Sequence, residues 1–476
     1  MRVGINSSPP SGRRRPAVVP VLAGVIVLAG YGASLAVNLP GHFGPDALWQ
    51  LEQGRSGVFN DWHPPVMAWL LGLADRVSPG APLFVVVNSA LFFGGLLAFA
   101  ALEPRPRPIC LPVLAILAAS PLALVYQGDV LKDVLFANAA MSGFAALAWA
   151  GKVWDRPAWR WSLLLLALAL FSLAALARQN GLVVPLCGAA ALSAIVWTRG
   201  RPTGWTPSLI ARGLAHGVLA MALVMVVAGL ATQALDAHGD GKPENSNQLK
   251  RLQIYDLAGA TRLDPAVSLA ILRKRRPDLE RFVRDQAAPI YRAASSDNIA
   301  ELPAGETMMA PAGDVAGKQW AALITGRPLL YLRARTDVFL ATLLTPSSAG
   351  CPLILVGVDG GDPALLRHLR LRARYDGKDE WDDDYASSFI GTPVFSHLFY
   401  LAVVVALTAL ALRQWLRGDR RPGPTVALAM GAAALLFTAS FFVVSGSCDY
   451  RYLYFLDVAA MAALVRQAAA RRLPSA

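Results

Sequence analysis

The stretch VVPVLAGVIVLAGYGASLAVNL, residues 18–39, decides the class of fold. It carries no charged residue and has the length of roughly 20 residues that an α-helix needs to cross a bilayer. It is apolar on every side, whereas a helix of a soluble protein has only an apolar stripe. It is too long for the core of a signal peptide and lacks a convincing small-residue cleavage site, so we interpret it as a first membrane span.

Similar apolar runs recur along the chain, and the composition agrees with them. Hydrophobic residues make up 55% of the sequence and charged residues 16%, which is unlike a soluble globular protein. The net charge is +12, but the Arg and Lys residues lie in short loops beside apolar runs, as in cytoplasmic loops that face anionic lipid. The charge therefore indicates membrane lipids as partners and no nucleic acid. Richness in Ala, Arg and Pro is typical of a bacterial chain of high genomic GC content.

We predict an all-α polytopic membrane protein with about ten transmembrane helices. The predicted spans are 18–39, 82–102, 109–126, 134–151, 161–177, 181–197, 213–234, 393–412, 424–445 and 452–467. Arg and Lys gather in alternate loops, which places these loops and both termini in the cytoplasm of a bacterial inner (plasma) membrane. The predicted parts are a disordered cytoplasmic tail 1–16, a membrane domain 17–234, an external periplasmic domain 235–392, a membrane domain 393–467 and a cytoplasmic tail 468–476.

The external domain 235–392 is polar and too long for a simple loop, and we expect it to be mainly helical. The expected helices are one from the N-cap Asp264 through Arg273, one over 277–292, and two amphipathic helices within 313–345 that lie along the membrane surface, with loop from there to about 391. Segment 253–257 of this domain is a weak candidate for lining a site.

The topology also separates the four cysteines. Cys351 and Cys448 fall outside, in an oxidising compartment, whereas Cys110 and Cys187 fall inside or within the membrane. We predict a disulfide between Cys351 and Cys448 that ties the external domain to the last external loop. Two free thiols are the alternative.

The segment GPDALWQLEQGRSGVFNDWHPPVMAWL, residues 44–70, contains the first external loop 40–63 and then opens a short interfacial helix, 64–73. The topology brings the following polar residues to the same face of the membrane: Asp46, Asp61, His63, Asp129, Lys132, Asp133, Arg178, Lys318, Asp449 and Arg451. Ionisable groups at span ends are costly unless they are paired or hydrated, so their convergence indicates a site. For each residue alone, an interfacial side chain with its head in water is the simpler interpretation.

The pentapeptide Asp61-Trp62-His63-Pro64-Pro65 resembles the end of the first external loop of protein O-mannosyltransferases and aminoarabinose transferases. These are GT-C glycosyltransferases, which use polyprenyl-phosphate-linked sugars. In that family an Asp early in the loop is the catalytic base or orients the acceptor, and Asp46 in Gly44-Pro45-Asp46 is the match. Segment 128–133 resembles the second external loop, and segments 178–181 and 451–452 resemble positions that contact the lipid phosphate. The likeness covers the span layout of about 1–200 and scattered points beyond.

The resemblance implies an inverting hexosyl- or pentosyltransferase of the cell envelope. It would transfer a sugar from a polyprenyl-phosphate donor to a lipid, glycan or protein acceptor at the periplasmic face. Asp46 would take the proton of the acceptor hydroxyl, and Asp133, the second catalytic candidate, would orient Lys132 or help to hold a divalent cation (Mg²⁺ or Mn²⁺). The substrate-binding candidates are Asp61, His63, Lys132, Arg178, Lys318 and Arg451, of which Lys132, Arg178 and Arg451 would stabilise the leaving phosphate. Mannosyltransferases carry Asp-Glu where this chain has Asp46-Ala47, so the donor sugar does not carry over.

Two other functions fit a polytopic membrane protein. A polysaccharide polymerase or ligase also has many spans, external arginines and a large external loop. A lipid or solute transporter is the other alternative, but no pair of Gly- or Pro-broken spans recurs in two halves of the sequence, and few charges lie in the middle of a span. The first loop with its His-Pro-Pro step favours the glycosyltransferase.

Overall fold

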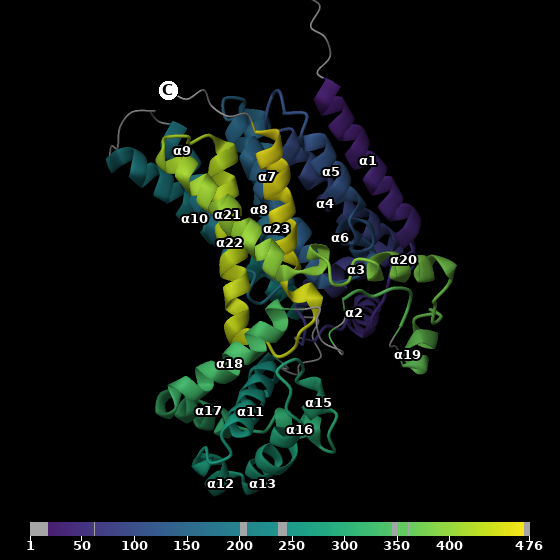
Figure 1. Cartoon of the computed structure of the whole chain (residues 1–476), viewed down its shortest axis with the longest axis vertical. Coiled ribbons are helices and arrows are strands. Elements are labelled where there is room, and N and C mark those ends of the chain that lie inside the picture. The colour runs from purple at the N-terminus through teal and green to yellow at the C-terminus, as the bar shows by residue number, and fades with distance from the viewer. Residues whose placement is uncertain are drawn as a thin grey trace, which may run out of the picture.

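The computed structural model describes residues 18–60, 62–199, 207–236, 245–344, 351, 353–359 and 362–470. This part of the chain is all-α: it contains helices and isolated β-bridges but no strand. The membrane helices form the upper part of the molecule in Figure 1, and helices α11–α18 form a separate lobe at the lower end. The chain therefore has a helical membrane domain and a helical lobe outside it, which we call the external lobe.

Among the described residues, seven helices are long and apolar enough to span a membrane. They are α1 (Val18–Asn38), α4 (Pro82–Ala100), α7 (Lys132–Lys152), α8 (Pro157–Ala177), α10 (Pro207–Asp236), α21 (His397–Leu416) and α22 (Pro422–Val444). Two shorter helices, α9 (Val183–Arg199) and α23 (Tyr454–Ala469), occupy the predicted spans 181–197 and 452–467. A helix thus lies at each predicted span, but fewer than ten are full-length crossings.

The predicted span 109–126 is not straight. It consists of α5 (Cys110–Ala119), followed by α6 (Pro121–Leu124) and η1 (Tyr126–Gly128), and the two parts meet at an angle of 68°. Ser120 between them is extended, as expected for a residue before proline, because the proline ring disfavours the helical conformation there. If this bent pair is one span, the count rises to eight.

Helix α7 lies at the centre of the membrane domain, and 89% of its apolar 18-residue stretch is buried. It packs against α4, α8, α22 and α23. Small residues allow this close approach: a Cβ at Gly143 would lie 2.8 Å from the ring of Phe171 on α8. Because its position is fixed by these neighbours, α7 provides a rigid base for Lys132 and Asp133 at its N-terminus.

The first external loop folds into α2 (Pro45–Ser56), and α3 (Val66–Val77) follows it, close to the predicted interfacial helix. These two helices touch where Gly54 faces Gly72, and a Cβ on Gly54 would meet the carbonyl oxygen of Ala68 at 2.4 Å. Only glycine permits this approach. The contact fixes α2, and with it Asp46, beside the end of α1 and the start of α4.

The external lobe has its own apolar core. Its helices are α11 (Asn245–Leu263), α12 (Ala270–Arg275), α13 (Pro277–Arg281), η2 (Phe282–Ala287), α14 (Ala288–Ile290), α15 (Asp297–Ala300), α16 (Gly305–Met309), α17 (Val315–Gly326) and α18 (Pro328–Leu343). The helix expected from Asp264 is wrong: α11 continues to Leu263, the Asp264 carboxylate accepts a hydrogen bond from the Ala266 N–H in a turn, and α12 begins only at Ala270. The helix expected over 277–292 exists as the consecutive pieces α13, η2 and α14.

The loop expected up to residue 391 is also partly helical, since it contains α19 (Pro363–His368) and α20 (Gly377–Ser387), with η3 (Pro393–Phe395) after them. The N-terminus of α20 is a capping box between Asp376 and Asp379, which explains why this polar segment is helical. In Figure 1, α19 and α20 lie beside α2 and α3, apart from the lower lobe.

A buried ion pair connects the lobe to the membrane domain. Arg335 on α18 lies 2.9 Å from Asp256 on α11, and both side chains are almost completely buried. The Arg335 guanidinium also donates to the carbonyl of Phe442 at the end of α22, at 2.8 Å. The Asp256 carboxylate accepts a further bond from the indole of Trp320. Arg335 therefore joins two helices of the lobe to one membrane helix.

The predicted disulfide between Cys351 and Cys448 is confirmed, with a Cα–Cα distance of 5.3 Å. Among the described residues, Cys110 and Cys187 are free and buried.

The disulfide anchors the segment 353–359, which we call the strap. Its far end pairs with the backbone of Phe43 and Arg374. Gly357 has a φ of +73°, a conformation that favours glycine, and a Cβ there would meet the Arg374 carbonyl at 2.1 Å.

Candidate functional site

A polar cleft of about 470 Å³ lies where the external lobe meets the membrane helices. It is lined by six of the residues predicted from the sequence: Asp46, His63, Lys132, Arg178, Asp449 and Arg451. Asp133 lies directly behind them and contacts Arg178. Lys318 is exposed on α17 and does not line the cleft, and Asp61 lies outside the described residues. The structure therefore joins residues from α2, α7, α8 and the segment before α23.

Asp46 is in the first turn of α2, after Gly44 and Pro45. Its carboxylate lies 2.9 Å from the Arg451 guanidinium and 3.5 Å from Nε2 of His63, and the side chain is 33% exposed. Burial raises the pKa of Asp46, but the hydrogen bond from His63 and the charges of Arg451 and Lys132 outweigh it and hold the pKa well below its usual range. Asp46 is thus an ionised carboxylate that still reaches the cleft.

His63 connects Asp46 to Lys132. The Lys132 ammonium lies 2.6 Å from Nδ1 of His63, and because an ammonium can only donate, Nδ1 is the acceptor. The ring proton is then on Nε2, which faces Asp46. Burial and the Lys132 charge lower the pKa of His63, so the ring is neutral at pH 7. His63 thus contacts two other predicted site residues, Asp46 and Lys132.

Asp133 and Arg178 form a buried ion pair at the base of the cleft. Arg178 is the residue that ends α8, and its guanidinium lies 5.3 Å and 5.4 Å from the ring centres of Phe441 and Tyr452. The second Asp133 oxygen lies 4.0 Å from Arg451. Asp133 therefore holds two cations in place, and its contacts are with Arg178 and Arg451 rather than with Lys132.

Arg451 belongs to η4 (Tyr450–Leu453), and it also binds Asp449 at 2.9 Å. The residue before it fixes this turn: Tyr450 donates to Asp457 at 2.7 Å, and its carbonyl lies 3.0 Å from the ring of His397. His397 also lies 3.0 Å from Asp457. Burial opposes the charge on Arg451, but Asp46 and Asp449 raise the pKa of Arg451 well above its usual range, so it is a permanent cation.

The external lobe contributes residues that the sequence analysis missed. Arg251 on α11 lines the cleft, where it lies 5.7 Å from the Trp62 ring and pairs with Asp297 at 2.9 Å. Gln248, one turn earlier, donates to the Trp62 carbonyl. The weak candidate segment 253–257 contributes Tyr255. Arg251 and Gln248 face the cleft from the first helix of the lobe, and their signal in the sequence was only the amphipathic pattern of that helix.

A smaller cavity of about 160 Å³ lies on the other side of Asp46. Both cavities share Asp46, Asp449 and Arg451. The smaller one is covered by apolar residues of the strap, Leu353 to Leu355, and it contains Asp129. Burial raises the pKa of Asp129 well above its usual range, which favours a neutral carboxylic acid. Asp46 and Arg451 thus stand between a cationic cleft and a less polar cavity.

The arrangement around Asp46 does not fit a metal ion. A divalent cation such as Mg²⁺ requires several oxygen ligands, whereas the Asp46 carboxylate contacts the nitrogen atoms of Arg451 and His63. Within the described ranges no group of three His, Cys, Asp or Glu side chains is placed to hold a metal.

Comparison with known proteins gives no family. No family model matches the sequence, and no curated protein matches it. Two solved structures of the oligosaccharyltransferase of Archaeoglobus fulgidus are similar: AglB with an inhibitory peptide and a dolichol-phosphate, and the apo form of the enzyme. Each matches 93% of this chain at 12% identity, with TM-scores of 0.41 and 0.40. This chain spans about half the length of those proteins, since the matches cover 50% of theirs.

Proposed function

We propose that this protein is a GT-C-type membrane glycosyltransferase that transfers one sugar from a polyprenyl-phosphate donor to an acceptor hydroxyl. The observation that carries the proposal is the position of Asp46. It is one ionised carboxylate, partly exposed, between two cavities and beside several cations. A displacement at the anomeric carbon needs a base on one side and cations for a leaving phosphate on the other.

The proposed reaction is a single inverting displacement. The acceptor oxygen forms a bond to the anomeric carbon as the bond from that carbon to the phosphate oxygen breaks. Asp46 takes the proton of the acceptor hydroxyl, and the electron pair of the broken bond leaves with the polyprenyl phosphate. No covalent enzyme intermediate forms, so one carboxylate is sufficient. The neutral His63 ring orients the Asp46 carboxylate through its Nε2–H.

The cationic wall of the cleft suits the leaving phosphate. Lys132, Arg178 and Arg251 line it. Lysine binds phosphate as a point charge, and arginine through its planar fork of N–H donors. Arg178 and Arg251 are already held by carboxylates and aromatic rings, so they need little reordering when a phosphate enters. This agrees with the phosphate-binding roles that the resemblance implies for Lys132 and Arg178.

The location and substrates complete the proposal. The positive-inside pattern of the loops supports a site at the periplasmic face of a bacterial inner membrane, with both termini in the cytoplasm. The donor would carry a hexose or pentose, and the acceptor would be a lipid, a glycan or a protein of the cell envelope. Asp133 would act through Arg178 and Arg451 as a positioning residue rather than at the reacting atoms.

The test has two parts. Comparing lipid-linked sugars and surface glycans in a deletion strain and its parent should show an accumulated polyprenyl-phosphate sugar and a glycan that lacks one residue. The protein purified in detergent should then release polyprenyl phosphate from that donor when the acceptor is added. Loss of long polymer with normal monomeric units would indicate a polymerase or ligase instead, and movement of an unaltered lipid-linked sugar across vesicles would indicate a transporter.

A further inference from the structure

A larger groove, of about 580 Å³, lies between α7, α8, α9 and α10 at the opposite end of the membrane helices from the cleft. Its position follows from α8. Arg160, which lines the groove, is in the first turn of this helix, whereas Arg178 of the cleft is at its other end. At 1.5 Å per residue the two arginines are about 27 Å apart along the helix, close to the thickness of the hydrocarbon layer. The groove is therefore separate from the proposed active site.

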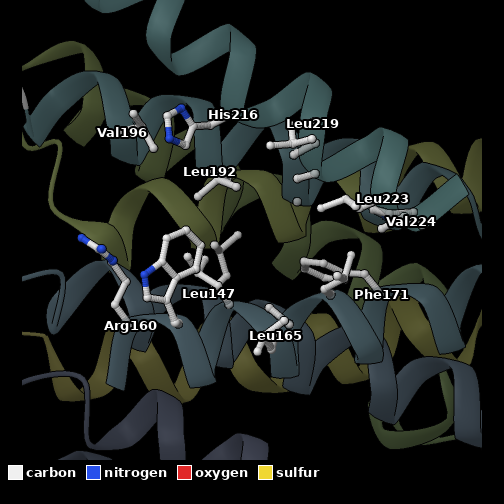
Figure 2. Close-up of a pocket in the computed structure, with 18 of the residues that line it drawn as sticks. Leu147, Arg160, Leu165, Phe171, Leu192, Val196, His216, Leu219, Leu223 and Val224 are labelled. Carbon is white, nitrogen blue, oxygen red and sulfur yellow. The ribbon is translucent and has the colours of Figure 1, made fainter. Parts of the chain in front are cut away.

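The body of the groove is apolar. Figure 2 shows Leu147, Leu165, Leu192 and Phe171 along it, with Leu223 and Val224 near the Phe171 end. From Arg160 to Phe171 the rise along α8 is about 16 Å, which is close to half of a ~30 Å hydrocarbon core. The length of the groove thus corresponds to one leaflet, the depth that one acyl chain of a phospholipid occupies.

The other end of the groove is cationic. Arg160, Arg199, Arg212 and His216 line it, and no acidic side chain is among its described lining residues. Arg160 and His216 both lie in the left half of Figure 2, on different helices. Within the described part of the chain, the acidic side chain that pairs with these arginines is Asp155, which is 3.7 Å from Arg199 and 90% exposed. The charge at this mouth is therefore largely uncompensated and suits an anionic head group.

Tryptophans place this cationic end of the groove at the membrane surface. The Arg160 guanidinium lies 5.1 Å from the ring centres of both Trp154 and Trp161, and it donates to the Trp154 carbonyl at 3.2 Å. Trp159 and Trp161 are largely exposed. Tryptophan is enriched at the level of lipid head groups, so these rings mark the depth at which a lipid phosphate would lie. They also hold Arg160 in place toward the groove.

We propose that this groove is a binding site for one anionic glycerophospholipid of the leaflet opposite the active site. Its phosphate binds Arg160, Arg199 and Arg212, and one acyl chain occupies the apolar body up to Phe171. The site is not catalytic, and the proposal does not rest on the proposed glycosyltransferase activity. The lipid would hold α8, α9 and α10 together. Of the seven candidate membrane spans among the described residues, α10 has the smallest buried share.

The test uses the full chain purified in a neutral detergent and native mass spectrometry with added dioleoyl phosphatidylglycerol or dioleoyl phosphatidylcholine. The wild type should retain the anionic lipid preferentially. The double variant Arg160→Gln/Arg212→Gln should bind phosphatidylglycerol about 30-fold more weakly, because each arginine near a lipid head group contributes about a factor of five. Arg199 is left unchanged because it also donates to the Gly151 carbonyl. Arg417→Gln, an exposed arginine at the end of α21, is the matched control and should bind as the wild type does.

A second variant tests the apolar part. Leu223→Trp places a large ring into an open part of the groove wall, where Leu223 is 42% exposed, and should reduce retention of phosphatidylglycerol without unfolding the protein. Unchanged affinity in both the double variant and Leu223→Trp would overturn the proposal, as would equal retention of phosphatidylcholine by the wild type. Displacement of bound phosphatidylglycerol by equimolar undecaprenyl phosphate would show instead that the site takes a polyprenyl phosphate.

Discussion

The buried pair of Arg335 and Asp256 should control how firmly the external lobe is docked. Arg335→Met removes the cation and leaves Asp256 buried beside Trp320. Breaking a buried ion pair on one side costs about 3–5 kcal/mol. For a unit of about 100 residues, such as this lobe, about 1 kcal/mol corresponds to roughly 4–8 °C. We therefore expect the thermal midpoint of the purified protein, followed by intrinsic fluorescence, to fall by on the order of 20 °C.

The same pair predicts a dependence on pH. Burial raises the pKa of Asp256, and Arg335 lowers it; without Arg335 the pKa rises further. A raised pKa makes the folded variant bind a proton more readily than the unfolded chain, so its stability improves as pH falls. The difference in thermal midpoint between the wild type and Arg335→Met should shrink from pH 8 to pH 5.5. At pH 8 the double variant Asp256→Asn/Arg335→Met should melt at a higher temperature than Arg335→Met.

The matched control is Arg333→Met, which changes an exposed arginine on the same helix. It should melt within a few degrees of the wild type. An equal midpoint for Arg335→Met and Arg333→Met, or a deficit that grows on acidification, would refute the reasoning that this pair fastens the lobe.

Three further predictions concern the site and the strap. Replacing Cys351 by Ser should lower the thermal midpoint under non-reducing conditions, because the disulfide joins residues separated by 97 positions and loops of this length contribute about 4–5 kcal/mol; an unchanged midpoint would contradict this. His63 is neutral at pH 7 with a lowered pKa, so activity should fall only as pH drops below about 6.5, when a protonated ring would repel Lys132. A pH–rate profile of His63→Gln should lack that acidic limb, and its persistence would exclude His63 as the cause. Arg451→Lys keeps the charge but cannot bind Asp46 and Asp449 together as the guanidinium does, so initial rates should fall about 100-fold, whereas wild-type rates would show that only the charge matters.

Much of the membrane domain follows from the sequence, because hydrocarbon thickness fixes the length of apolar runs. The bend at Ser120 was missed since the run 109–126 is apolar throughout; the Pro121 within it was the signal. At the predicted span 452–467 the structure has the helix α23. Its Asp457 is buried with partners from other elements, His397 and Tyr450.

The sequence predicted most of the residues that line the cleft, but not which of them contact one another. The topology placed Asp46, Lys132, Arg178 and Arg451 on one face, and they do line one cleft. The contacts of His63 with Asp46 and Lys132 were not predicted, because they join residues that lie apart in the sequence. Of the lobe, the candidate segment 253–257 contributes Tyr255, but Gln248 and Arg251 were missed. Nothing local to α11 indicates that Arg251 reaches Trp62 of the first external loop.

The most direct test of the central claim is sugar transfer by Asp46→Asn. The variant keeps the size of the side chain but removes the base, so the rate of transfer from the polyprenyl-phosphate sugar should fall by about 10²–10⁴-fold, with expression and thermal midpoint near those of the wild type. Glu52→Gln, which removes a carboxylate from the same helix away from both cavities, should leave the rate unchanged. Wild-type transfer by Asp46→Asn would contradict the account.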